Sequence, residues 1–149
     1  MTNQAKQVEK VSDVIQVLRA GAEFYKDATA EIDHSSLKAT LKRMADHKVD
    51  TIAQLQPLAV AEQGETETGS SWAVEARKMY TKFASAVSSD KDYTFVNQLE
   101  EVEDKVLAAL DDALEEEQPA SAQIVLRTVR ANAQSVHDEM KALQKRLEH

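Results

Sequence analysis

Apolar residues recur every three or four positions along four long stretches of this chain, and this spacing constrains the fold more than any other feature. An α-helix turns once every 3.6 residues, so this spacing gathers apolar side chains on one helix face, whereas a strand needs strict alternation. The pattern predicts four amphipathic helices that bury their apolar faces against one another. The first stretch, at about residues 4–32, carries Val8, Val11, Ile15, Leu18, Ala22, Tyr25 and Ile32.

The other three long helices are expected at about residues 36–62, 90–117 and 119–146. Ser35 or Ser36 is expected to cap the second helix, because a serine hydroxyl accepts a hydrogen bond from a free N–H of the first turn. Pro57 lies inside the same helix, and its missing N–H predicts a kink or an early end there. The chain has only three Gly and two Pro, which leaves little material for turns and favours long helices.

A linker and a shorter helix separate the two halves of the chain. Residues 63–70 contain two glycines and no large apolar residue. Residues 71–88 have the spacing of a helix, with Trp72, Tyr80 and Phe83 on one face. We expect these aromatic residues to pin the helix to the bundle; the alternative is that they form a surface for a partner.

Loop lengths predict the topology. The two short loops make each pair of long helices antiparallel, and the helix at 71–88 is long enough to span about 27 Å between the pairs. The expected fold is all-α: a ferritin-like up-down-down-up four-helix bundle with an additional crossover helix between the second and third long helices. The alternative is a five-helix array without the crossover. Residues 1–146 are expected to form this single domain, and residues 147–149 are expected to be a tag-derived scar.

Charge and composition exclude several classes of function. The net charge is −8 and no basic stripe is present, so no nucleic-acid partner is expected. No run of about 20 apolar residues predicts a membrane span, and the polar start resembles no secretory signal, which together favour a cytoplasmic protein. Cys is absent, and so are a glycine-rich phosphate loop and a nucleophile turn. We therefore expect no catalytic residue and no enzyme activity, and consider a protein partner or a homo-oligomer.

The bundle centre carries an incomplete set of metal ligands. Ferritin-like proteins use one Glu from each of two helices and Glu-x-x-His from each of the other two. In this chain Met44 precedes His47 and Gln134 precedes His137 where that motif has Glu. Glu23 is expected to face away from the core, since helix rotation turns Ala22 inward instead. We therefore expect no cofactor and a degenerate metal site.

His47 and His137 both lie on the flanks of the apolar stripes of their helices. A histidine in such a position is more often a boundary residue bonded to a neighbouring residue than a metal ligand. The alternative is a weak iron or manganese site at mid-bundle. Its ligands would be His47, Glu100, Glu103 and His137.

Two charged residues, by contrast, project into the apolar stripes at similar depth. Lys48 lies near the middle of the second helix's stripe and Glu103 near the middle of the third's. A lone buried charge costs several kcal/mol, so the simplest prediction is a Lys48–Glu103 ion pair. The Tyr25 hydroxyl and Asn132 are expected to complete its hydrogen bonds. The alternative is that Lys48 carries its ammonium along an apolar stem to the surface.

Four short motifs give the chain a resemblance to a known family. They are GAEFY at residues 21–25, QLQPL at 54–58, EEVED at 100–104 and VHDEM at 136–140. With these motifs the chain resembles small bacterial four-helix-bundle proteins of the ferritin-like superfamily, known mainly as a domain of unknown function. That family usually has two adjacent acids in the first motif, where Ala22 takes the inward position here, and a basic residue at the position of Lys48.

The resemblance implies a bacterial, cytoplasmic protein with a stress-related role. From the residues and the resemblance together we expect a non-catalytic structural or partner-binding protein, with core polar contacts in place of a dimetal site. The alternative is a divergent iron- or manganese-binding protein.

Overall fold

The computed structural model describes residues 6–70 and 91–147, and within these ranges it contains four helices and no strand. The predicted all-helical class is confirmed for this part of the chain. The shorter helix expected at residues 71–88, with its aromatic face, lies outside the described residues. The four helices are α1 (Val11–Glu31), α2 (Ser35–Gln63), α4 (Lys91–Glu115) and α5 (Ala120–Leu147).

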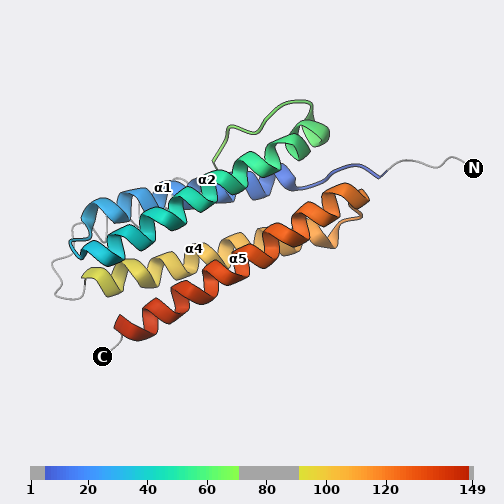
Figure 1. Ribbon diagram of the computed structural model, residues 1–149. Helices are drawn as coiled ribbons and strands as arrows, with labels where there is room; N and C mark the ends of the chain where they lie inside the picture. The colour runs from blue at the N-terminus through green and yellow to red at the C-terminus, as the bar shows by residue number, and fades with distance from the viewer. Residues whose placement is uncertain (1–5, 71–90, 148–149) are drawn as a thin grey trace, which may run out of the picture.

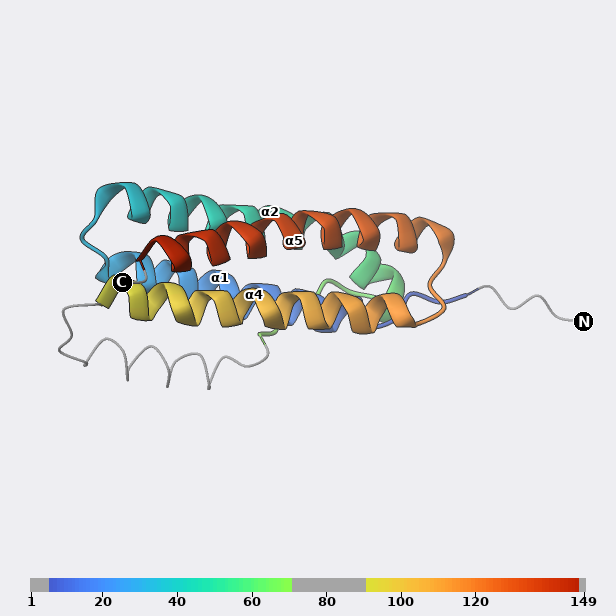
Figure 2. The same ribbon diagram turned by 90° about the horizontal axis from the view of Figure 1, so that it is seen from below.

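Two antiparallel hairpins pack side by side. α1 and α2 form the first hairpin and α4 and α5 the second (Figures 1 and 2). α1 packs against α4, and α2 lies beside α5 with far fewer close approaches. α2 and α4 run in the same direction along opposite corners of the bundle, as Figure 2 shows. A side chain that reaches from α2 to α4 must therefore cross the bundle centre.

The ends of α2 differ from the sequence expectation. His34, not a serine, precedes the helix as its cap residue, and the Ser36 Oγ lies 3.0 Å from the His34 Nδ1. The helix also continues through Pro57, so the early end expected there is wrong. Gly64 directly follows α2 and caps its end; its φ of 89° is left-handed and its N–H bonds the Val60 carbonyl at 2.8 Å. Glycine suits this position because it has no Cβ to clash in that conformation.

Two tertiary contacts fix the start of α1, which begins at Val11 instead of near residue 4. Gln118 is buried and bonds both the N–H and the carbonyl of Glu9, so the segment before α1 is held against the α4–α5 turn. Glu62 accepts hydrogen bonds from the N–H and the hydroxyl of Ser12 at 2.9 and 3.0 Å. A carboxylate here satisfies free N–H groups at the positive end of the helix dipole.

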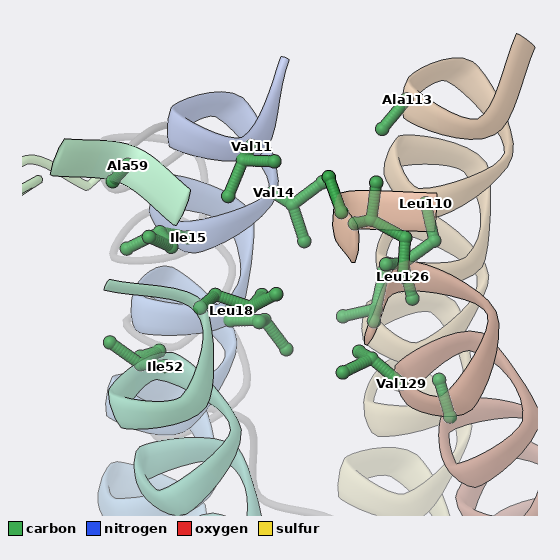
Figure 3. Close-up of a cluster of buried hydrophobic side chains, with 14 of the residues drawn as sticks. Val11, Val14, Ile15, Leu18, Ile52, Ala59, Leu110, Ala113, Leu126 and Val129 are labelled. Atoms are coloured by element: carbon green, nitrogen blue, oxygen red, sulfur yellow. The ribbon is translucent and has the colours of Figure 1, made fainter. Parts of the chain in front are cut away.

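In the part of the chain that the structure describes, the apolar core consists of two clusters, one toward each end of the bundle. Figure 3 shows the cluster near the start of α1, where Val14 and Leu18 face Leu110 and Leu126 of the second hairpin. Lys48 and Glu103 belong to neither cluster and lie at the level between them. Within the described residues, no helix combines the length and the apolar character needed to cross a membrane.

A buried ion pair at the bundle centre

Lys48 of α2 and Glu103 of α4 meet across the bundle centre. The Lys48 Nζ lies 2.5 Å from the Glu103 Oε2, and the two side chains are 3% and 1% exposed. Each residue projects inward because it falls on the apolar stripe of its own helix, at about 100° of rotation per residue. The Lys48 ammonium does not reach the surface. The contact therefore joins diagonally opposite helices, which share no backbone contact.

The Tyr25 side chain of α1 completes the pair. Its hydroxyl donates a hydrogen bond to the same Glu103 oxygen, and the Lys48 Nζ lies 4.6 Å from the centre of its ring. A cation at this distance from an aromatic ring is attracted to the ring's negative face. Burial, and then the negative charge of Glu103, raise the pKa of Tyr25 well above 10.0. Tyr25 therefore stays protonated and able to donate.

Burial has the opposite effect on the lysine. It lowers the pKa of Lys48 from 10.5, and the Glu103 carboxylate opposes this shift by stabilising the ammonium. The second carboxylate oxygen, Glu103 Oε1, is buried and accepts no hydrogen bond from the described protein groups. The Oε2 oxygen thus accepts both hydrogen bonds. The neutral tyrosine and the charged lysine share a single acceptor.

Gly21 gives the lysine its space, and the sequence analysis did not identify this role. A Cβ built at Gly21 would lie 2.9 Å from the Val102 Cγ1 and 3.3 Å from the Lys48 Cε. The first distance is shorter than real side chains tolerate, so any larger residue would require the Val102 side chain or the two helices to shift. A glycine in a helix interior costs about 1 kcal/mol relative to alanine. A glycine inside a predicted helix therefore indicates a packing requirement, and this signal could have identified the role of Gly21 from the sequence.

Asn132, the fourth residue expected in this group, is a correction. It is exposed on α5, while its neighbour Ala133 is buried. The sequence count placed Asn132 at the correct depth along the bundle, but one residue of helix rotation turns it outward. The inward positions Ala22 and Met44 are buried but offer no carboxylate or imidazole, whereas the carboxylate of Glu23 is exposed.

The four residues of the alternative iron or manganese site do not converge. Glu103 is engaged in the core, whereas Glu100 and His137 meet on the seam between α4 and α5, 3.7 Å apart. His47 lies beside a surface groove of about 590 Å³ between α2 and α5. Burial, and then the charge of Lys48, lower the pKa of His47. Asp104, which the sequence analysis did not single out, lies 2.7 Å from the His137 Nε2.

Comparison with known proteins gives one match. The model of a family described as a domain of unknown function (DUF2383) matches residues 6–116, which include Tyr25, Lys48 and Glu103. Searches of curated proteins and of solved structures each found no match.

Proposed function

The chain belongs to the DUF2383 family, and we propose that it is a non-catalytic, ferritin-like bundle with a structural or partner-binding role. The observation that carries this proposal is the Lys48 ammonium, 2.5 Å from the Glu103 carboxylate at the bundle centre. Ferritin-like proteins hold two metal ions between carboxylates and imidazoles projecting into the core. Lys48 supplies one positive charge in the place of those ions.

The course of the helices supports the ferritin-like part of this proposal. α2 and α4 run in the same direction (Figure 2), so α2 ends and α4 begins at opposite ends of the bundle. In up-down-down-up bundles a long crossover connects two such ends. The 27 residues between Gln63 and Lys91 are long enough to do so.

The donor set does not fit a dinuclear metal centre. Such a centre needs several carboxylates and imidazoles around two cations, but Glu103 is the one buried carboxylate among the described residues. Lys48 and Tyr25 already engage its Oε2. An ammonium that is itself buried at this oxygen would repel a metal ion.

The same enclosure argues against catalysis by these three residues. Lys48, Glu103 and Tyr25 are all buried, so a substrate cannot touch the ammonium, the carboxylate or the phenol. They contact one another from three helices, and their role is to hold those helices in register. Buried polar pairs have this effect in some helical assemblies, because a shifted register would leave the charges unpaired.

The proposal extends to the setting of the protein. We infer a bacterial, cytoplasmic, stress-related protein, as the family resemblance implies. A net charge of −8 disfavours nucleic acid as a partner, since a polyanion would be repelled. We infer a protein partner or a second copy instead.

A double-mutant cycle in urea tests the core role. Lys48→Met and Glu103→Leu each strand one buried charge, so each alone should lower the free energy of unfolding by about 3–5 kcal/mol. The double variant replaces the pair by apolar side chains of similar size, and its stability should return to that of the wild type or exceed it. Single losses below about 1 kcal/mol would mean that the charges reach water, and would contradict the proposal.

Elemental analysis tests the metal-free centre. Protein purified without a chelator should show the same iron and manganese content in the wild type and in Glu103→Leu. One or two equivalents of either metal in the wild type, lost in the variant, would favour the divergent metal-binding alternative instead.

A further inference from the structure

We propose that Glu100, Asp104 and His137 bind one divalent cation of the zinc class on the outer seam between α4 and α5. Glu100 and Asp104 lie one helical turn apart on α4, and His137 faces them from α5. One ligand atom from each residue lies within 4.8 Å of the other two. This site is separate from the buried ion pair and does not depend on the proposed function.

The distances are close to those of a zinc shell. Zinc binds imidazole nitrogen and carboxylate oxygen at about 2.0–2.2 Å, so two ligand atoms of a tetrahedral shell stand roughly 3.3 Å apart. The His137 Nε2 lies 3.7 Å from the Glu100 Oε1 and 2.7 Å from the Asp104 Oδ1. Each of these two distances needs to change by only about half an ångström, and the ligand oxygens of Glu100 and Asp104 lie within 4.8 Å of each other. The Asp104 side chain is 56% exposed and has room to make this adjustment.

The other side of the imidazole ring provides a second, independent observation. The His137 Nδ1 is buried and makes no hydrogen bond within the described residues, although the Asp138 Oδ1 lies 3.6 Å away. The Gln134 amide holds that carboxylate at 2.9 Å. A metal-bound histidine binds the metal through one ring nitrogen and usually donates the N–H of the other to such a carboxylate. This hydrogen bond directs the lone pair of the first nitrogen at the metal. A small ring movement toward Asp138 would make this bond.

The mixture of donors points to the class of cation. One imidazole nitrogen with two carboxylate oxygens suits zinc and its neighbours cobalt and nickel, whereas magnesium and calcium prefer oxygen alone. Three carboxylates, those of Glu100, Asp104 and Asp138, surround this one imidazole. Their negative charges favour the binding of a cation at this site. Three protein ligands leave a fourth tetrahedral position for water or for a side chain of a partner.

Calorimetric titration of the full chain with Zn²⁺ tests this site. The wild type should bind one equivalent, and His137→Ala and Asp104→Asn should each weaken the affinity by at least 10-fold, since even a supporting residue's loss costs about 10–100-fold. Co²⁺ added instead of Zn²⁺ should show the visible absorption of a tetrahedral site in the wild type but not in the two site variants. His34→Ala and His47→Ala are the matched controls, because each removes an imidazole elsewhere, and both should bind as the wild type does.

Three results would overturn the inference. They are no binding by the wild type, binding that keeps its affinity in both site variants, and an equal loss in the His34→Ala control. Circular dichroism without metal establishes that each variant is folded. Asp104→Asn is an isosteric change at an exposed residue, so it carries the test even if His137→Ala unfolds the seam.

Discussion

At the scale of single residues, the buried Lys48 needs both a counterion and space, and two other helices provide them. Glu103 of α4 is the counterion, and Gly21 of α1 leaves room for the lysine stem. The space is as specific as the charge, since a methyl group at Gly21 would meet Val102 at 2.9 Å. A lysine cannot be placed in a bundle core by changing one position alone.

Gly21→Ala tests this complementarity. In an open helix the change would stabilise by about 1 kcal/mol, but overpacking a core costs about 1–3 kcal/mol. We expect a net loss of up to about 2 kcal/mol in urea unfolding. The same change made in a Val102→Ala background should be neutral or stabilising, because the nearest contact is gone. If Gly21→Ala raised the free energy of unfolding by about 1 kcal/mol in the wild-type background, the space between α1 and α4 would accommodate a methyl group, and the prediction would be wrong.

Tyr25→Phe tests the hydrogen bond and its dependence on pH. Removing a hydrogen bond to a charged group should cost about 1.5–3 kcal/mol at pH 7. The folded-state pKa of Tyr25 is raised above 10.0, so the unfolded chain ionises first as the pH rises. The stability that Tyr25 contributes is therefore complete below pH 10 and is lost above it, by about 1.4 kcal/mol per pH unit. The measurement is the difference in unfolding free energy between wild type and variant from pH 7 to 11. A constant difference would mean that the phenol ionises as freely as in water.

At the scale of helices, the sequence predicted what depends on local spacing. The positions of all four long helices follow from the apolar period, and most of their ends agree to within about two residues. The predicted start of α1, near residue 4, was wrong because Gln118, more than 100 residues away, holds Glu9 in a non-helical segment. α2 continues past Pro57 because Ala53, whose carbonyl loses its usual partner, lies on the exposed face where water can replace the bond.

The candidate sites divide in the same way. Helix rotation alone indicates that Lys48 and Glu103 point inward, so their meeting could be anticipated from the sequence. The fit at Gly21 and the approach of Asp104 to His137 depend on the separation and relative rotation of two helices. Those quantities are set by packing across the whole core, and no local pattern contains them.

At the scale of the whole molecule, the two hairpins are joined unequally along their two seams. α1 packs closely on α4, whereas α2 and α5 approach each other at few points. Two surface grooves lie along the α2–α5 seam, of about 590 and 340 Å³. The ion pair between Arg43 and Glu139, 2.5 Å apart, links the two helices there, but the two side chains are 61% and 40% exposed. Such pairs contribute little to stability, so the buried contacts of the core must hold this side of the bundle.

A larger apolar side chain in the groove should therefore stabilise the protein. Ala39 of α2 lines the larger groove with Met44 and Val136, and leucine there would bury apolar surface against them. We expect Ala39→Leu to raise the free energy of unfolding by roughly 0.5–2 kcal/mol, as filling of cavities commonly does. The matched control is Ala53→Leu, at an exposed position of the same helix that does not line this groove, with a change within about 0.5 kcal/mol. If the two changes had equal effects in urea unfolding, helix propensity, and not the filling of the groove between α2 and α5, would determine the gain in the free energy of unfolding.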